Sequence, residues 1–311
     1  MLLLLLAVVV TSFDTLSIDL ERYPIDKLES VEGQALVARC RQELEAHGSI
    51  SLGGFIKPSV IGQMASEVTG LPSHHRLDIV GPYFFVPGPL NTPPDHPNKK
   101  RIAQDVHAVA MDQIPKQSLL RQVYDSPVVM KFLAAALGLD RIFQFDDEFQ
   151  GVNVMYMRDG GSRAWHYDGS DFVVTLLLQA SDQGGEFEFA PFIRGQPPTD
   201  TPTTNSINSN NTSQYAYENY DKVAQLFNGN YSTRVSRAAA GTLQLFNGRR
   251  SLHRVRAVYG PTQRIQSVLS YDVKPGQKST EAKNIILYGE RVRAIYEARR
   301  VAADSTHHPD L

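Results

Sequence analysis

The chain has 311 residues, of which 42% are hydrophobic and 21% charged, and its formal net charge is −2. This composition is typical of a folded globular protein and excludes a disordered chain. A nearly neutral chain lacks the basic surface of proteins that coat nucleic acid, so we expect no nucleic-acid partner.

The first residues, 1–10, form an apolar run that is about half as long as a membrane span. The run lacks the basic start and the small-residue cleavage site of a signal peptide. We therefore expect no stable membrane span, a cytoplasmic protein, and an N-terminal segment over residues 1–28. The alternative is a secreted protein, which the Asn-X-Ser/Thr triplets at Asn210, Asn211 and Asn230 favour.

Helical spacing of apolar residues predicts helices over 29–47, 58–71 and 117–137. A strand is expected at 50–56, and the prolines of 72–104 predict a loop. The single cysteine, Cys40, lies in the apolar pattern of the first helix, so we predict a core position for it. One cysteine also excludes a disulfide framework and a cysteine-rich zinc site.

From about residue 142 onward, short β-rich runs follow one another, separated by Gly, Pro, Asn or Asp. They cover 150–157, 171–179, 185–190, 241–246, 252–258 and 264–273. This rhythm predicts an antiparallel sandwich or barrel. We expect one α+β domain over 29–303, with N-terminal helices packed on a β-core at about 142–275. A loop insertion at about 195–232, a helix at 279–301 and a tail at 305–311 complete the prediction.

Three residues have the types and spacing of a metal site. His166 and Asp168 are two positions apart, and on an extended chain such residues point to the same face. One imidazole and one carboxylate under-coordinate a metal, and His253, which follows a strand and a turn, is the natural third ligand. Two histidines and one carboxylate on one face of a metal suit non-haem Fe(II), with three positions left open.

Arg264 is the second feature that points to this chemistry. If 252–258 and 264–273 form a hairpin, His253 falls opposite Val268, and Arg264 shares the interior face with Val268. A guanidinium inside a barrel must pair with an anion. A dicarboxylate that chelates the metal at one end and meets Arg264 at the other satisfies this need. By the same parity, Arg254 and Arg256 face outward as solvated charges.

The set His166, Asp168, His253 and, eleven residues later, Arg264 resembles the Fe(II)/2-oxoglutarate-dependent dioxygenases. This resemblance implies a double-stranded β-helix (jelly-roll) core, Fe(II), 2-oxoglutarate as cosubstrate, and O₂. The local sequence is most similar to the enzymes that hydroxylate, halogenate or oxidatively cyclise free amino acids. The similar stretches are WHYDGSDFVVTLLLQ (165–179), GGEFEFAPFIR (184–194) and LFNGRRSLHRVRAVYGPTQRIQSVLSYD (245–272).

Two positions depart from the pattern of these relatives, and one matches it. Halogenating members carry glycine in place of the metal carboxylate, so Asp168 implies an enzyme that does not halogenate. Many relatives have Ser or Thr two residues after the arginine, where this chain has Gln266, so another hydroxyl is expected to contact the far carboxylate. Tyr156 occupies a place where relatives often carry a tyrosine that lines the cosubstrate; the alternative is a plain strand aromatic.

Four further residues are predicted around a substrate. Arg101 would bind a carboxylate, unless it is a surface arginine beside Lys99 and Lys100. Glu148 would meet an ammonium group, unless it belongs to a solvated acidic loop. Val268 would contact an aliphatic substrate, although a core position explains it equally well, and Trp165 would pack under the site.

The function predicted from the sequence is oxidation of an aliphatic C–H bond in a small free amino acid or a derivative, with succinate and CO₂ as coproducts. The same chemistry leads to hydroxylation, desaturation or ring closure such as aziridine formation, and the sequence does not choose among them. An alternative is the same enzyme class acting on a peptidyl residue or a secondary metabolite. The third alternative is a metal-binding jelly roll without catalysis, which gives Arg264 no reason to face inward. Oligomeric state is open.

Overall fold

The structure is a computed structural model that describes residues 12–71, 75–77, 92–195 and 217–307. From residue 152 onward the chain alternates between two antiparallel sheets. The larger sheet takes β5 (Val152–Met157), β7 (Val173–Gln179), β11 (Leu243–Phe246) and β14 (Arg264–Leu269). The smaller sheet takes β6 (Arg163–His166), β9 (Phe187–Ala190), β10 (Arg234–Ser236) and β12 (Leu252–Val255).

The order of these strands defines the fold. The larger sheet runs β11-β7-β14-β5 and the smaller sheet β10-β9-β12-β6, so consecutive strands mostly lie in opposite sheets. Eight strands wound in this way form the double-stranded β-helix, which confirms the predicted fold class. The larger sheet is extended by β1 (Ser49–Leu52) at one edge and by β3 (Val106–Val109) and β2 (His75–Leu77) at the other.

Short strand pairs close the ends of the core. β8 (Gln183–Gly184) pairs with β13 (Val258–Tyr259), and β4 (Phe143–Gln144) pairs with β15 (Tyr271–Asp272). The structure also contains strands that the sequence analysis missed, β6 above all. His166 is the last residue of that strand, which lies between the predicted runs 150–157 and 171–179.

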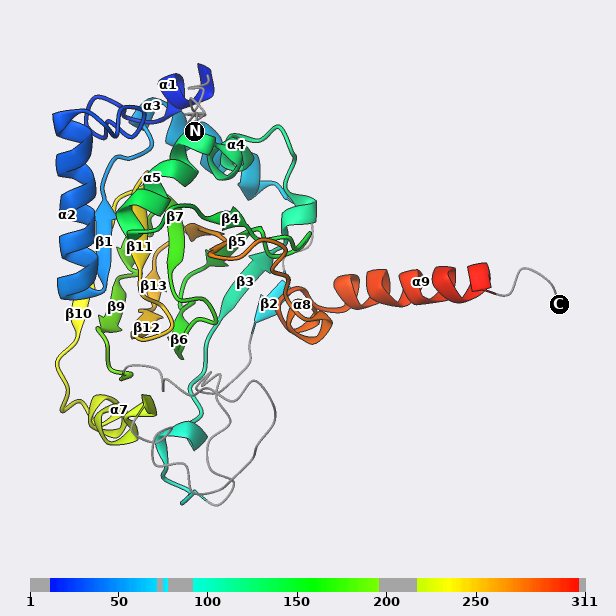
Figure 1. The fold of residues 1–311 in the computed structure, drawn as a ribbon. Helices are drawn as coiled ribbons and strands as arrows, with labels where there is room; N and C mark the ends of the chain where they lie inside the picture. Colours follow the sequence, from blue (N-terminus) through cyan, green and yellow to red (C-terminus); the bar gives the residue numbers. More distant parts are fainter. Residues whose placement is uncertain (1–11, 72–74, 78–91, 196–216, 308–311) are drawn as a thin grey trace, which may run out of the picture.

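Helices cover one face of the larger sheet, as Figure 1 shows for α2 (Val31–His47) and α5 (Pro127–Leu137). With α1 (Ser12–Ser17), α3 (Pro58–Thr69) and α4 (Leu119–Asp125) they bury the side chains of alternate strand residues, among them Val154 and Ile265. Ile18, Tyr23 and Ile25 belong to the same core. Part of the predicted N-terminal segment 1–28 therefore packs on the helix layer of the domain predicted over 29–303.

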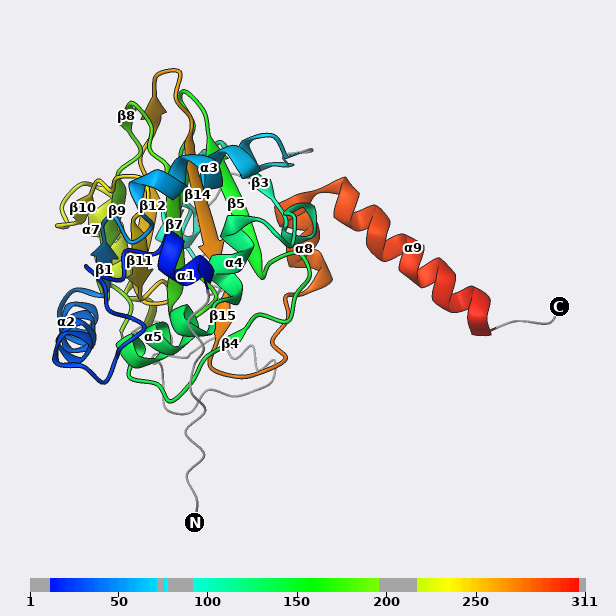
Figure 2. The same cartoon turned by 90° about the horizontal axis from the view of Figure 1, so that it is seen from above.

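Two of the predicted helices are divided in the structure. Pro127 begins α5 and separates it from α4, because proline is favoured in a first helical turn and disfavoured inside a helix. Gly289, at φ +73°, separates α8 (Glu281–Tyr288) from α9 (Glu290–His307). In Figures 1 and 2, α9 extends away from the sheets.

Two further elements lie in segments predicted as loops: the 3₁₀ turn η1 (Pro97–Lys99) and the helix α7 (Tyr220–Phe227), which packs on the smaller sheet's outer face. The 3₁₀ turn η2 (Met111–Gln113) lies in a segment for which the sequence analysis predicts no element. Within the described ranges, no helix is long and apolar enough to cross a membrane. Residues 1–10, the triplets at Asn210 and Asn211, and most of the 195–232 insertion lie outside the described residues.

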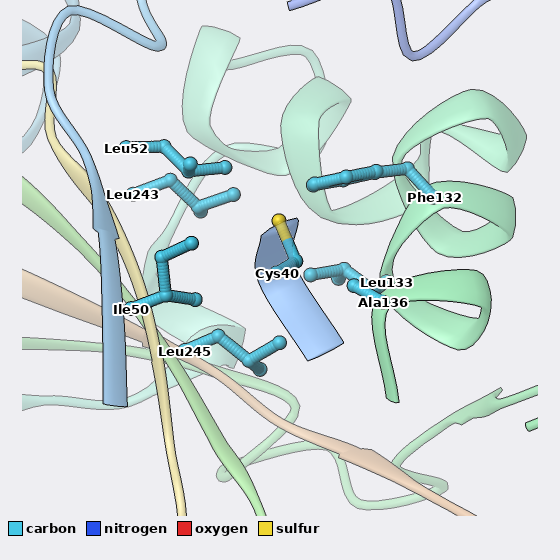
Figure 3. A pocket seen from close by; sticks show the side chains of 8 residues that line it. All are labelled: Cys40, Ile50, Leu52, Phe132, Leu133, Ala136, Leu243 and Leu245. Carbon is cyan, nitrogen blue, oxygen red and sulfur yellow. The ribbon is translucent and has the colours of Figure 1, made fainter. Parts of the chain in front are cut away.

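Cys40 lies in the helix layer, as predicted. Figure 3 shows it facing Ile50 and Leu245 of the larger sheet and Phe132 of α5, around a cavity of about 10 Å³. Cys40 is 1% exposed, and burial raises the pKa of its thiol to about 11. We expect no reaction of the native protein with iodoacetamide at pH 8 and one alkylated site after denaturation, measured by mass spectrometry. Rapid native alkylation would contradict this packing.

Glu188 joins strands on the outer face of the smaller sheet. It accepts hydrogen bonds from Arg254 (Nε–Oε2 2.8 Å), Arg256 (Nε–Oε2 2.7 Å) and Thr233 (Oγ1–Oε1 2.7 Å). Arg254 and Arg256 thus face outward as predicted, but both are paired and not simply solvated. Burial alone would raise the pKa of Glu188, and the bonds from Arg256, Thr233 and Arg254 outweigh it and hold the pKa at about 2.

The direction of this shift sets a pH dependence. A carboxylate whose folded pKa is depressed stabilises the fold above its unfolded pKa, and the contribution is lost as pH falls through the folded value. We expect Glu188→Gln to lower the free energy of unfolding by about 1–2 kcal/mol at pH 7, after allowance for solvent screening. Urea unfolding should show the difference shrinking between pH 4.5 and pH 2. A difference independent of pH would contradict the assignment.

Candidate metal centre

The structure brings His166, Asp168 and His253 together between the two sheets. β6 and β12 are neighbours in the smaller sheet, and their residues His166 and His253 are directly paired, with ring centroids 4.1 Å apart. Asp168 follows in the loop after β6. Its Oδ1 lies 3.7 Å from His166 Nε2, and its Oδ2 lies 3.1 Å from His253 Nε2. One donor atom from each residue falls within 4.8 Å of the others.

Backbone carbonyls fix both imidazoles in one tautomer. His166 Nδ1 is 2.8 Å from the carbonyl of Ala164, and His253 Nδ1 is 2.9 Å from that of Ser251. Because a carbonyl only accepts, each Nδ1 carries the proton, and each Nε2 turns a lone pair toward Asp168. Such backbone bonds orient the histidine ligands of metal sites.

The contact between His253 and Asp168 is one that a bridging cation would make. With only Nδ1 protonated, Nε2 and Oδ2 face each other as two acceptors at 3.1 Å, and Oδ2 is buried. Two facing acceptors repel each other unless a positive ion lies near them both. The donor set therefore fits a divalent metal held by two imidazole nitrogens and one carboxylate oxygen.

The pKa shifts of His166 and Asp168 agree with a role as metal ligands. Burial lowers the pKa of His166 well below its usual value, and the charges of His253 and Arg163 lower it further, so the ring is neutral at pH 7. Burial alone would raise the pKa of Asp168, but His253, His166 and Arg163 outweigh it and bring the pKa to about 2. A neutral His166 and an ionised Asp168 are the protonation states in which these two residues bind metal.

Gly248 makes room for the carboxylate. The turn between β11 and β12 brings its carbonyl to the backbone N–H of Asp168, at 3.1 Å. A Cβ on Gly248 would lie 2.2 Å from Asp168 Oδ2 and 2.9 Å from Asp168 Cβ. The sequence gives no sign of this contact, since the two residues are 80 positions apart (248 − 168). Beside His253, the rings of Phe246 and Phe187 form an apolar wall, with centroids at 4.9 and 5.7 Å.

Arg264 is buried on the face of β14 that is turned to the smaller sheet. Ile265 and Leu269 pack into the helix-covered core, so Arg264, Gln266 and Val268 face the other way. Its Nε donates to the carbonyl of Gly185 at 3.1 Å, and Nη1 donates to the side-chain oxygen of Gln266. No carboxylate of the described ranges lies within ion-pair distance of it, and burial lowers its pKa to about 10.

Ser181 is a hydroxyl beside Arg264 that the sequence analysis did not find. Ser181 Oγ and Arg264 Cδ both lie close to Gly185: a Cβ placed on this glycine would be 2.7 Å from the first and 2.9 Å from the second. The two side chains are therefore neighbours. Ser181 is buried and donates to the carbonyl of Gly184 at 3.2 Å. Ser181 therefore supplies a buried hydroxyl beside Arg264, of the kind that the sequence analysis expects for the far carboxylate.

The predicted hairpin between β12 and β14 is wrong. His253 pairs with His166 and with Phe189 of β9, whereas Val268 pairs with Asn153 and Thr175 in the larger sheet. In a jelly roll these two consecutive strands belong to opposite sheets, so they face each other across the core and do not share a ladder. Val268 is half-buried on the same face of β14 as Arg264.

Tyr156 and Trp165 do not face the centre. Tyr156 is buried in the helix-covered core, and its hydroxyl donates to the carbonyl of Val68 in α3 at 2.6 Å. It therefore lies on the opposite face of the sheet from Arg264. Trp165 packs in the cluster under α7, with the guanidinium of Arg254 4.7 Å from its ring, on the opposite side of β6 from His166. The prediction that Tyr156 lines the cosubstrate is wrong, because alternation does not tell which face is inside, whereas the position of Trp165 behind His166 agrees with a residue that packs under the site.

Glu148 is paired elsewhere, and Arg101 is exposed. Both carboxylate oxygens of Glu148 accept from Arg299 of α9, which accounts for its charge without a substrate. Arg101 lies in a segment that runs antiparallel to β6, where Asp105 and Ser162 exchange backbone hydrogen bonds of 3.0 Å. This direction carries the chain from Asp105 back toward the His166 end of β6, so Arg101 remains a candidate.

Arg163 is a cation near the ligands that the sequence analysis missed. It begins β6, pairs with Val255 of β12, and donates from Nη1 to Gln104 Oε1 at 3.2 Å. Its charge lowers the pKa of both His166 and Asp168, although alternation along β6 places Arg163 on the face of Trp165 and not on that of His166.

No family model matches the sequence, and no curated protein matches it. Solved structures with a similar fold do exist. An oxidoreductase of the 2OG-Fe(II) oxygenase family from Burkholderia pseudomallei is 15% identical, with 78% of this chain and 92% of that chain covered and a TM-score of 0.49. AviO1 from Streptomyces viridochromogenes Tue57 is 12% identical, with 78% and 97% covered and a TM-score of 0.48.

A prolyl hydroxylase from Trichoplax adhaerens, solved with a peptide fragment of the hypoxia inducible factor oxygen degradation domain, is also similar. It is 14% identical, with 84% of this chain and 93% of that chain covered and a TM-score of 0.46. The fold of the present chain follows from its own strand order, and its chemistry follows from the side chains described above.

Proposed function

We propose that this chain is a non-haem Fe(II)/2-oxoglutarate-dependent oxygenase that oxidises an aliphatic C–H bond of a small free amino acid or a derivative. One observation carries the proposal. Three metal donors that lie within 4.8 Å of one another, and an arginine with no carboxylate partner among the described residues, lie between the same two sheets. A dicarboxylate that binds a metal and a guanidinium at once satisfies both features.

Each residue then has a defined task. His166, Asp168 and His253 hold the metal, and Arg264 with Ser181 binds the distal carboxylate of the cosubstrate. When bound, Fe(II) would activate O₂ for oxidation of the C–H bond, and 2-oxoglutarate would be converted to succinate and CO₂. Phe187 and Phe246 shield the His253 side of the centre from water.

The amino-acid substrate is supported by two arginines on segments that lead to His166. A free amino acid needs a cation for its carboxylate, and Arg163 and Arg101 both lie on segments that lead to His166. Glu148 is engaged by Arg299, so it is not assigned to the ammonium group. The same enzyme class acting on a peptidyl residue or a secondary metabolite is the alternative, and a non-catalytic metal-binding jelly roll ranks last.

The first experiment is anaerobic. Fe(II) and 2-oxoglutarate are added to the apoprotein, and we expect the weak visible charge-transfer band of the metal–cosubstrate chelate. Pooled amino acids are then added, and we expect the band to shift. A band without a shift would reject the amino-acid substrate and move the search to peptides and secondary metabolites. Absence of the band would reject the cosubstrate and with it the oxygenase.

Two variants test the substrate arginines in the same titration. We expect Arg163→Gln or Arg101→Gln to keep the chelate band and to weaken the amino-acid-induced shift about tenfold or more, as loss of a charge-assisted contact would. Arg299→Gln, on the surface, is the matched control and should leave the shift unchanged. An unchanged shift in both arginine variants would remove them from the substrate site.

A further inference from the structure

Arg194 and Glu218 form an ion pair that is almost wholly buried. Arg194 Nε lies 2.8 Å from Glu218 Oε2 and Nη2 lies 3.0 Å from Oε1, with side-chain exposures of 2% and 0%. Burying two charges is costly, and an apolar pair of similar size would stabilise a fold equally well. The other contacts of the Arg194 guanidinium indicate a role for this pair besides stability.

The guanidinium also contacts both chain segments that carry the metal ligands. Its carbon lies 3.7 Å from the ring centroid of Tyr167, the residue between His166 and Asp168. Its Nη1 donates to the carbonyl of Arg249 at 3.0 Å. Arg249 belongs to the turn that leads from β11 to His253 in β12.

That turn is in direct contact with the ligands. Its residue Gly248 accepts a hydrogen bond from the backbone of Asp168, and its residue Ser251 accepts from His253. The backbone N–H of Arg194 donates to the carbonyl of Arg250 in the same turn, at 3.1 Å. Arg194 thus binds the turn through its backbone N–H and its Nη1. The planar face of its guanidinium packs on Tyr167, in the segment from His166 to Asp168.

We propose that Arg194, held in place by Glu218, is a positioning residue for the metal centre: it fixes Tyr167 against the turn 247–251, so that His166, Asp168 and His253 stay at the spacing of one metal ion. The inference rests on the proposed metal site. It goes beyond that site in assigning metal affinity to a buried pair whose hydrogen bonds join Arg194 to Glu218 and to the Arg249 carbonyl and not to the three ligand side chains.

Only arginine makes this set of contacts. Nε and Nη2 serve Glu218, Nη1 serves the Arg249 carbonyl, and the planar face lies on the Tyr167 ring. A lysine ammonium is a point charge with no flat face, so it cannot reproduce the fork and the stack together. Tyr167→Phe keeps the ring, whereas Tyr167→Leu removes it, which gives a conservative and a disruptive variant at the second position.

The test is Co(II) binding to the full-length apoprotein, read from the visible ligand-field bands and by calorimetry, beside the thermal midpoint of each apoprotein. We expect Arg194→Lys, Tyr167→Leu and the double variant Arg194→Met/Glu218→Leu to weaken Co(II) binding about 10–100-fold and to alter the bands, as loss of groups that orient ligands does. The double variant replaces the pair by apolar side chains and is expected to stay folded. Tyr167→Phe should bind like wild type.

Asp147→Asn is the matched control for stability loss. Asp147 is buried and accepts hydrogen bonds from Ser279 and Asn284, away from the ligand segments. We expect a lower thermal midpoint with unchanged Co(II) affinity. Unchanged affinity and bands in the Arg194 variants, with only their midpoints lowered, would overturn the positioning role. Failure of wild-type protein to bind Co(II) would instead overturn the metal site itself, so the two failures are distinguishable.

Discussion

Gly248→Ala is expected to abolish metal binding while leaving the fold intact. A methyl group there would lie 2.2 Å from Asp168 Oδ2, and the end of a side chain moves more easily than backbone does. The carboxylate should therefore swing out of the centre. We expect metal affinity to fall by more than about 100-fold, beyond the ~10–100-fold cost of disturbing groups that only orient ligands. Anaerobic titration with Fe(II) or Co(II) measures the effect.

Gly62→Ala is the matched control for this substitution. Gly62 lies in α3, and a Cβ there would meet nothing within 4 Å. Alanine favours a helix by up to about 1 kcal/mol over glycine, so this variant should be slightly more stable and bind metal normally. Wild-type metal affinity in Gly248→Ala would contradict the close contact between position 248 and the Asp168 carboxylate.

Arg264→Met is expected to weaken 2-oxoglutarate binding on the order of 100-fold without changing metal affinity. The variant removes charge-assisted hydrogen bonds to the distal carboxylate, which contribute about 3 kcal/mol, and it leaves His166, Asp168 and His253 in place. Arg264→Lys should recover part of the loss, because it keeps the charge but not the fork. The chelate band, titrated with 2-oxoglutarate at saturating Fe(II), gives the dissociation constant.

The control for Arg264 is an arginine of the same sandwich that faces outward. Arg256→Ala removes a partner of Glu188 and should lower stability without affecting the cosubstrate. Equal dissociation constants for wild type and Arg264→Met would exclude Arg264 as the anion partner. A parallel loss of Fe(II) affinity would show that Arg264 acts on the metal ligands and not on the cosubstrate.

Local patterns predicted the parts of the molecule that depend on neighbouring residues. The spacing of His166 and Asp168 places them on one side of the chain, and the rhythm of short strands indicates a jelly roll. Alternation along β14 separates Arg264 from Ile265 whichever strand lies beside it, so that step does not depend on the wrong hairpin. The position of Cys40 follows from helical periodicity in the same way.

Contacts between distant segments could not be predicted in this way. Alternation divides β5 into two faces but does not tell which one the helices cover, so Tyr156 was assigned to the wrong face. Glu148 is paired with Arg299, 151 positions away, and no local pattern indicates that partner. The contact of Gly248 with Asp168 and that of Arg194 with Tyr167 arise only when the loops of the folded sandwich meet.

The inert thiol of Cys40 makes the natural chain a single-cysteine background for site-directed labelling. Because Cys40 is 1% exposed and is the sole cysteine, a second cysteine at an exposed position would react with a maleimide alone. Val301 on α9, 70% exposed, is one such position, and Leu16 on α1, 68% exposed, is another. Spin labels there could report, one site at a time, how far each helix lies from a paramagnetic ion bound between the sheets.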